Sequence, residues 1–181
     1  MKMPELDILR EVLNNGLFMG FENDSILLSE SGSDARLRQV KILGLDADCL
    51  VLKMDKIQIQ GFFKGGGPNK RCDYLILTEH GDKKYAIFIE MKSTFKEPEI
   101  IRQFKGSECL IDYCKSVLTR FHGKSQLLAK YKKHFVIFYK TSINKTGTRP
   151  RKFKKNNAPE KAIKYADPHE VSLSQLIATP L

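Results

Sequence analysis

A chain of 181 residues, of which 41% are hydrophobic, is long enough to bury a full core and fits a single domain. No apolar run approaches the roughly 20 residues that a membrane-spanning helix needs, so we expect no membrane partner. The N-terminus alternates charged with apolar residues, which is not the pattern of a secretory signal, and four cysteines without a CxxC pair indicate free thiols in a reducing cytoplasm.

The net charge of +10 is concentrated in one C-terminal stretch. Residues 121–159 contain eleven Lys and Arg and no acid, while the rest of the chain holds 20 basic and 21 acidic residues. Such a stretch attracts a polyanion, and counterion release favours nucleic acid. The alternative is a solvated, solubilising surface.

The N-terminal half of the chain predicts one helix followed by strands. Apolar residues at helical spacing place an amphipathic helix at 4–17, which ends at Asn14-Asn15-Gly16. Residues 21–35 predict a loop around a short apolar piece. The strands that follow are predicted, in chain order, at 40–43, 48–54, 72–78 and 84–91. Residues 57–60 alternate apolar with polar side chains, so we expect them either to extend the strand at 48–54 or to pair with it.

Gly65-Gly66-Gly67-Pro68 interrupts the series of strands. The segment lacks the GK[ST] ending of a phosphate-binding loop, which excludes nucleotide binding by that route and favours a flexible connection. The alternative is a basic flap over a ligand, formed by Lys64, Lys70 and Arg71.

The C-terminal half predicts a long helix, a buried strand and a smaller tail. Acids and a proline at 97–99 suit the positive end of a helix dipole, and an apolar stripe predicts a helix over 97–118 that Gly106 weakens. The remaining predictions are a helix at 127–133, a strand at 134–139, a basic loop at 144–157 and a short strand or turn that enters a terminal helix.

This element order indicates a mixed α/β or α+β domain with a central sheet flanked by helices. We expect one domain over residues 1–181, with a core at about 3–140 and a basic C-terminal extension at 141–181.

The two strands around residues 73–92 each carry an acid at one end. If they form a hairpin whose two-residue turn is Gly81-Asp82, Asp73 lies directly opposite Glu90, and Lys92 projects from the same face. Opposed carboxylates destabilise a sheet, so they must share a proton or bind a divalent cation. Two carboxylates completed by water and a substrate phosphate are typical of a Mg²⁺ site.

Lys92 beside such a metal can activate an attacking water or contact the scissile phosphate, which suits phosphodiester hydrolysis. The alternative is structural: Asp73 pairs with Arg71, and Glu90 pairs with Lys92 on an exposed edge. Apolar residues on both strand faces favour central strands instead. Leu75, Leu77, Ala86 and Phe88 share the face of the acids, and Tyr74, Ile76, Ile87, Ile89 and Met91 cover the other.

Asp73, a gap of sixteen residues and then Glu90-Met91-Lys92 at the end of an apolar strand resemble the motif of the PD-(D/E)xK nuclease superfamily. The resemblance implies a restriction-endonuclease-like core of helix, three strands, helix and strand. It also implies that Asp73, Glu90 and the backbone carbonyl of Met91 bind Mg²⁺, for which Mn²⁺ can substitute, and that Lys92 is the catalytic lysine. The proline that precedes the aspartate in the family is Cys72 here.

Two further positions follow from the resemblance alone. Many members carry an acid in the first helix, for which Glu5 and Glu11 are the candidates, and some carry a catalytic glutamine in the helix after the motif, here Gln103. The alternative for Gln103 is an exposed polar residue of the helix. A tyrosine four residues after that glutamine, found in one branch, is Ser107 here, so that branch is not assigned.

The resemblance therefore implies a Mg²⁺-dependent endonuclease that acts on nucleic acid, with DNA favoured, in repair, recombination or antiviral defence. We expect a homodimer or part of a larger complex. The alternative is a non-catalytic nucleic-acid-binding or docking subunit with the same fold. Aromatic residues among the basic ones, which stack bases or pack in the core, are Phe121, Tyr131 and Phe153. The basic residues expected to bind nucleic acid are Lys64, Lys70, Lys145, Arg149, Arg151, Lys152, Lys154 and Lys155.

Overall fold

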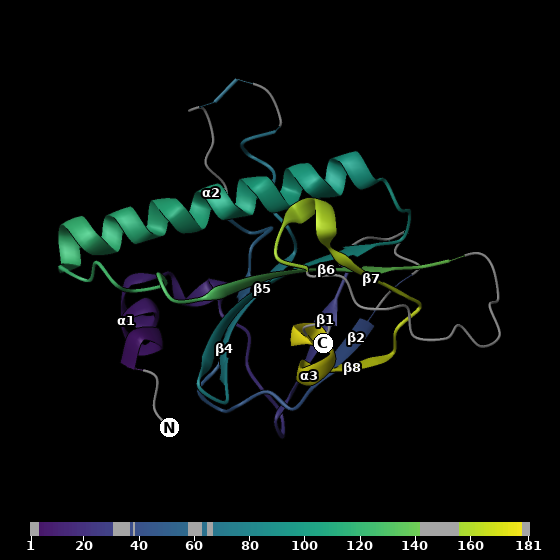
Figure 1. The fold of residues 1–181 in the computed structure, drawn as a ribbon, viewed down its shortest axis with the longest axis horizontal. Coiled ribbons are helices and arrows are strands. Elements are labelled where there is room, and N and C mark those ends of the chain that lie inside the picture. The colour runs from purple at the N-terminus through teal and green to yellow at the C-terminus, as the bar shows by residue number, and fades with distance from the viewer. Residues whose placement is uncertain are drawn as a thin grey trace.

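A computed structural model describes residues 4–30, 37, 39–57, 63–64, 67–141 and 156–178. These residues form three layers: helices, a five-stranded sheet, and a smaller sheet with a short helix (Figure 1). The helices are α1 (Pro4–Val12), α2 (Glu97–His122) and α3 (Leu173–Ile177), with 3₁₀ turns η1 (Asn15–Leu17) and η2 (Pro159–Lys161).

The five-stranded sheet has the order β3-β4-β5-β6-β7. Its first three strands are antiparallel neighbours, and β6 and β7 continue the sheet in parallel with β5. The strands are β3 (Leu50–Lys53), β4 (Tyr74–His80), β5 (Lys83–Lys92), β6 (Lys132–Tyr139) and β7 (Ile163–Ala166). The β5–β6 connection passes through α2, as a parallel pair requires.

The smaller sheet has the order β1-β2-β8, with β1 and β2 antiparallel and β2 and β8 parallel. Its strands are β1 (Ser25–Ser29), β2 (Gln39–Leu43) and β8 (Glu170–Ser172). Residues 156–178 therefore supply a strand to each sheet as well as α3.

Separate hydrophobic cores cover the two faces of the five-stranded sheet, because successive side chains of a strand point to opposite faces. One core joins the sheet to α1 and α2, and the other joins it to the smaller sheet and α3. The predicted assignment of the hairpin's apolar side chains to the two faces of the sheet is confirmed. Leu75, Leu77, Ala86 and Phe88 lie in the α2 core, and Tyr74, Ile76, Ile87, Ile89 and Met91 lie in the other.

Most predicted elements are confirmed, and the general class is α+β with mixed sheets and flanking helices. The predicted helix at 4–17 ends at Val12, and the one at 97–118 continues to His122. The predicted terminal strand and helix are β8 and α3. Residues 58–60 and 142–155, which hold most of the predicted strand at 57–60 and of the basic loop, lie outside the described ranges.

Two predicted segments are wrong. The loop predicted at 21–35 contains β1, whose burial alternates along the strand and whose inward side chains Ile26 and Leu28 enter the second core. The helix predicted at 127–133 consists of turns, with Leu128 at a positive φ of 65° that a helix does not allow, and β6 already begins at Lys132. In both places tertiary pairing overrides local propensity.

No helix in the described part of the chain is long and apolar enough to cross a bilayer.

Candidate functional site

The hairpin of β4 and β5 has the register that the sequence predicts. Its pairs run from His80 opposite Lys83, around the Gly81-Asp82 turn, to Tyr74 opposite Ile89. Gly81 has a φ of 60°, in the region that favours glycine at such a turn. Asp73 precedes the last pair by one residue, so the register carries it to the position across from Glu90.

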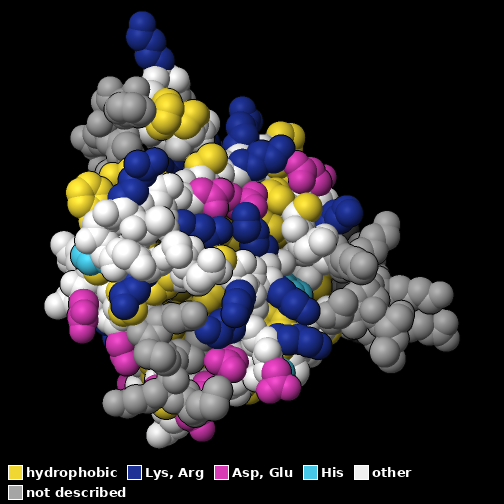
Figure 2. Space-filling model, turned by 60° about the vertical axis from the view of Figure 1, so that its left-hand side comes forward, with side chains coloured by type: hydrophobic (Ala, Val, Ile, Leu, Met, Phe, Trp, Pro, Cys, Tyr) yellow, Lys and Arg dark blue, Asp and Glu magenta, His cyan; other side chains and the backbone are white. Residues whose placement is uncertain are grey.

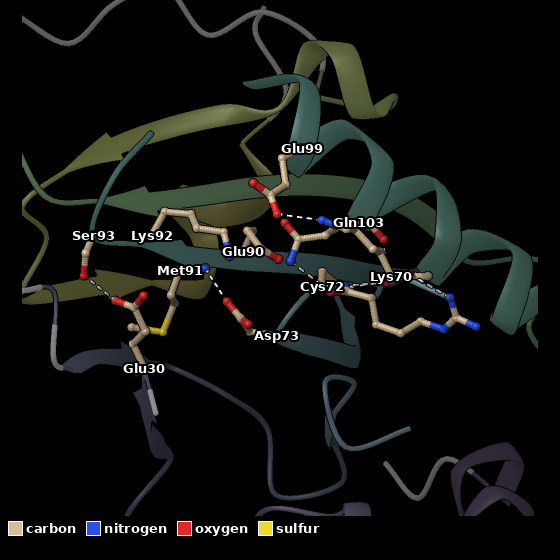
Figure 3. Close-up of polar contacts among 12 residues, drawn as sticks. Glu30, Lys70, Cys72, Asp73, Glu90, Met91, Lys92, Ser93, Glu99 and Gln103 are labelled. Carbon is tan, nitrogen blue, oxygen red and sulfur yellow. Dashed lines mark hydrogen bonds and ion pairs between the residues drawn. The ribbon is translucent and has the colours of Figure 1, made fainter. Parts of the chain in front are cut away.

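Asp73 anchors its carboxylate to the neighbouring strand. Its Oδ2 accepts a hydrogen bond of 2.7 Å from the backbone N–H of Met91, the residue between Glu90 and Lys92 (Figure 3). Its carbonyl oxygen accepts the Met54 N–H at 2.8 Å, which holds the end of β3 against the same residue. The Asp73 side chain is therefore bonded to β5 at the point where β4 begins and β3 and β5 end.

Glu90 is a carboxylate in the interior of the protein. Its side chain is 0% exposed and lies under α2 in the middle of the sheet, and Lys92 Nζ is 2.6 Å from its Oε1. Its Oε2 makes no hydrogen bond within the described residues. The Glu90–Lys92 ion pair named as a structural alternative is present, but it belongs to a central strand and not to an exposed edge.

Burial sets the electrostatics of the three groups. Burial raises the pKa of Asp73 to about 6, with smaller contributions from Asp55 and Glu30, against the opposing effects of the Met91 N–H and Lys92. Burial and then the charge of Asp73 raise the pKa of Glu90 well above its ordinary value. Burial acts to lower the pKa of Lys92, but the charge of Glu90 and their hydrogen bond outweigh it and raise that pKa.

The pair of carboxylates fits a divalent cation. One lysine faces a fully buried acid, Glu90, and a partly buried one, Asp73, both of which have raised pKa values. Glu90 Oε2 makes no hydrogen bond in the described ranges, although the Gln103 amide is close enough to lower the pKa of Glu90. A cation would stabilise both ionised carboxylates, and hard oxygen donors of this kind suit Mg²⁺. Where the chain is described, no three His, Cys, Asp or Glu side chains form a complete metal cluster, so main-chain oxygen, water and substrate would complete the coordination.

A segment that we call the strap, residues 67–72, leads into Asp73 and lies against α2. A Cβ atom at Gly106 would be 2.1 Å from the Lys70 carbonyl oxygen, so helix and strap approach more closely than any side chain allows. Ser107 Oγ accepts the Cys72 N–H at 2.8 Å from the next position of the helix. Gly106, predicted to weaken the helix, is instead required by this contact.

Two residues singled out in the sequence, Gln103 and Arg71, make their hydrogen bonds to the strap. Gln103 is partly buried on α2, where its Nε2 donates to the Arg71 carbonyl oxygen at 3.2 Å and its amide is near enough to lower the pKa of Glu90. Gln103 therefore joins the strap to the site. Arg71 does not pair with Asp73: its NH1 donates to the carbonyl oxygens of Pro68 and Lys70 at 2.6 and 2.7 Å.

Glu30 and Asp55 are neighbours of the site that the sequence did not indicate. Glu30 directly follows β1, and its Oε2 accepts the Ser93 hydroxyl at 2.9 Å (Figure 3). Asp55 follows β3 by two residues. The smaller sheet brings Glu30 to the Asp73 end of the hairpin, and only the packing of the two sheets could reveal this.

The other predicted residues are not part of the group formed by Asp73, Glu90 and Lys92, or their side chains lie outside the described part. Glu11 is exposed on α1, and the acids that raise the pKa of Asp73 are Asp55 and Glu30 instead. Nothing is described of the Glu5 side chain. Lys64 is exposed, and Lys70 is paired with Glu99 at 2.6 Å. Outside the described ranges lie Lys145, Arg149, Arg151, Lys152, Phe153, Lys154 and Lys155.

Of the aromatic residues predicted to stack bases or to pack in the core, one is exposed and one is in the core. Phe121 is 79% exposed near the end of α2, so its ring is accessible for stacking on a base. Tyr131 is 9% exposed and belongs to the α2 core.

The raised pKa of Asp73 predicts a pH dependence of stability in metal-free buffer. Between about pH 4 and about pH 6 the folded protein binds more protons at Asp73 than the unfolded chain does, so raising the pH across this window lowers stability and the effect then levels off. Glu90 acts in the same direction. The measurement is urea unfolding of wild type and of Asp73→Asn from about pH 4 to about pH 7. As the pH rises, the free energy of unfolding of the wild type should fall relative to that of Asp73→Asn. A difference independent of pH would contradict a raised pKa at Asp73.

No family model, curated protein or solved structure matches the chain.

Proposed function

We propose that the protein is a Mg²⁺-dependent nuclease of the PD-(D/E)xK type, with a restriction-endonuclease-like core, that hydrolyses phosphodiester bonds of nucleic acid. The observation that supports it most is the convergence of Asp73, Glu90 and Lys92 at one end of the central hairpin. A purely structural Glu90–Lys92 pair has no need of a second acid beside it, because the charge of Asp73 raises the pKa of the buried Glu90 carboxyl and so costs stability.

Asp73, Glu90 and the Met91 carbonyl oxygen would hold the cation. When bound, Mg²⁺ supplies Lewis-acid polarisation of the phosphoryl oxygen and a water of lowered pKa. The protein contributes position: the Met91 N–H fixes the Asp73 carboxylate, and the interior of the sheet fixes Glu90. Such preorganised charges need no rearrangement when the substrate arrives.

Lys92 is the cation of this group and has access to solvent. Its side chain is 26% exposed, while that of Glu90 is fully buried. The ammonium can therefore shift from Glu90 to an incoming phosphate once the carboxylate has a cation as its partner. It would stabilise the charge that develops on the scissile phosphate or orient the attacking water.

The charge distribution supports nucleic acid as the substrate, with DNA favoured. The basic residues of 121–159 would provide the electrostatic attraction, apart from Lys133 and Lys140, which pair with Glu108 and Asp167. Lys and Arg side chains also spread across the face of the molecule shown in Figure 2, with acidic side chains among them. Cutting both strands of a duplex commonly requires two active sites, so we propose a homodimer or a larger complex for that substrate.

The proposal is tested by incubating the purified protein with plasmid, linear duplex DNA, single-stranded DNA and RNA in Mg²⁺, in Mn²⁺ and in EDTA. We expect cleavage of at least one substrate in either metal and none in EDTA. Asp73→Asn should retain binding but not cleave, because it keeps the shape of the side chain and removes the charge that holds the cation.

The alternative, a non-catalytic binding subunit, makes the opposite prediction. Wild type that binds nucleic acid but cleaves none of the four substrates in either metal would favour that alternative and contradict the nuclease proposal.

A further inference from the structure

A second ionic cluster lies beside the catalytic centre, at the start of α2. Glu99 Oε1 is 2.6 Å from Lys70 Nζ, and each side chain is 38% exposed. Glu99 is one helical turn before Gln103, so it lies on the same face of α2 as the residue that contacts the strap. Figure 3 shows Glu99 above Gln103 and Glu90, with Lys92 near them. The ion pair is therefore at the solvent side of the proposed active site.

Lys70 is held in place by its backbone. The absence of a side chain at Gly106 lets the Lys70 carbonyl pack directly on α2, and that carbonyl also accepts from Arg71. The next residues of the strap are joined to α2 through Gln103 and Ser107. The main chain at Lys70 is thus held in place without any contribution from Glu99, and Glu99 orients only the ammonium group.

The Glu99 carboxylate contacts one lysine, Lys70, and experiences the charge of two others. Besides Lys70, Lys92 and Lys96 act on its carboxylate, and together they lower its pKa. Lys92 is the proposed catalytic lysine, and Lys96 is the exposed residue at the N-cap of α2. Carboxylate and phosphate oxygens accept the same charge-assisted hydrogen bonds from an ammonium group.

We propose, on the basis of the nuclease function above, that Lys70 and Lys96 together with Lys92 form a subsite for a backbone phosphate, and that Glu99 occupies it in the free protein. The ligand class is the phosphodiester backbone of a nucleic acid. Glu99 stands in for that phosphate, keeps the lysines in place, and competes with the substrate for them. It therefore limits affinity and restrains non-specific binding.

The first turn of α2 also supplies a matched control. Glu97 forms an ion pair with Lys164 at 2.7 Å, and the side chains are 47% and 36% exposed. Glu97→Gln and Glu99→Gln thus each raise the net charge by one and break one surface ion pair at the same end of the same helix. They differ in distance from the strap and from Lys92.

The test is the affinity of wild type, Glu99→Gln and Glu97→Gln for fluorescein-labelled single-stranded and duplex DNA oligonucleotides, measured by anisotropy in EDTA so that no cleavage occurs. We expect Glu99→Gln to bind about fivefold more tightly than wild type, from removal of one competing surface charge, and Glu97→Gln to stay within about twofold. The gain should disappear in Lys70→Ala/Glu99→Gln, because the lysine that it frees is then missing.

Opposite outcomes overturn the inference. If the only role of Glu99 is to attach the strap to α2 through Lys70, Glu99→Gln should lower the thermal unfolding midpoint of the protein. The variant should then bind DNA no more tightly than Glu97→Gln does. A gain that persists in the double variant would also exclude Lys70 as the phosphate ligand. Failure of all variants to bind would overturn the subsite together with the nuclease proposal. Equal affinities in a protein that still cleaves in Mg²⁺ would overturn the subsite alone.

Discussion

Lys92→Ala is expected to slow cleavage by about 10²–10⁴-fold while nucleic-acid binding remains, since general acid–base or electrostatic assistance is worth that much. Lys92 Nζ lies 2.6 Å from the buried Glu90, and its side chain is 26% exposed. Alanine removes both the charge directed at the scissile phosphate and the partner of a buried carboxylate. Single-turnover cleavage in saturating Mg²⁺ is the measurement, because it isolates the chemical step.

Loss of folding must be distinguished from loss of chemistry in this variant. Breaking a buried ion pair leaves an uncompensated charge, which destabilises a protein by about 3–5 kcal/mol unless the group takes up a proton. Glu90→Gln/Lys92→Ala removes that charge as well, so it should unfold near the wild-type midpoint, which identifies the unpaired Glu90 charge as the cause of any instability. Cleavage is compared for Lys92→Ala itself, at a temperature where circular dichroism shows that the variant is folded. Cleavage at the wild-type rate by the folded variant would leave Lys92 with a structural role only.

Lys140→Ala is the matched control for Lys92→Ala. Lys140 directly follows β6, its N–H donates to the Lys92 carbonyl at 3.0 Å, and its side chain pairs with Asp167 at 2.9 Å. The substitution removes a lysine at the same end of the sheet but leaves the carboxylates untouched. Cleavage within about twofold of wild type is expected, as for an ordinary surface ion pair.

Gly106→Ala is expected to destabilise the protein by about 2–3 kcal/mol, the upper range for forcing an extra methyl group into a packed interior. The new Cβ would be 2.1 Å from the Lys70 carbonyl oxygen, which is backbone and cannot rotate away. Helix propensity alone predicts the opposite sign, because alanine is better than glycine in a helix interior by about 1 kcal/mol. The sign of the change in the free energy of unfolding in urea therefore decides between the two effects.

Ser116→Ala provides the comparison on the same helix. Ser116 is exposed on α2, and its hydroxyl bonds only to the helix carbonyl of Asp112 among its described contacts, so this substitution should be neutral or slightly stabilising. Gly106→Ala should also reduce cleavage, because moving the strap displaces Lys70 and the chain that leads into Asp73. Equal stabilisation by both substitutions would contradict the close contact between strap and helix.

The hairpin could be predicted from the sequence because its determinants are local. The Gly81-Asp82 turn fixes the register, and the period of two then places Asp73, Glu90 and Lys92 on one face. The same period of two assigns the apolar side chains of the hairpin to the two cores correctly. Both faces of these strands are covered, so alternate apolar residues enter different cores.

The surroundings of the site could not be predicted because they depend on distant parts of the chain. Gly106 is required by a strap 36 residues earlier in the sequence, and Glu30 reaches the site through the packing of the smaller sheet. β7 is short and only partly buried, and pairing with β6 alone defines it. Local propensity carries no information about such contacts.

The most direct test of the central claim is a Mn²⁺ titration of wild type and Glu90→Gln, followed by electron paramagnetic resonance of the free ion. If Asp73 and Glu90 together hold the catalytic cation, wild type binds Mn²⁺ competitively with Mg²⁺. Glu90→Gln should then bind it at least about tenfold more weakly, because one charged ligand is lost. Equal Mn²⁺ affinity in the two proteins, or no binding by wild type, would contradict the assignment of this carboxylate pair as a metal site.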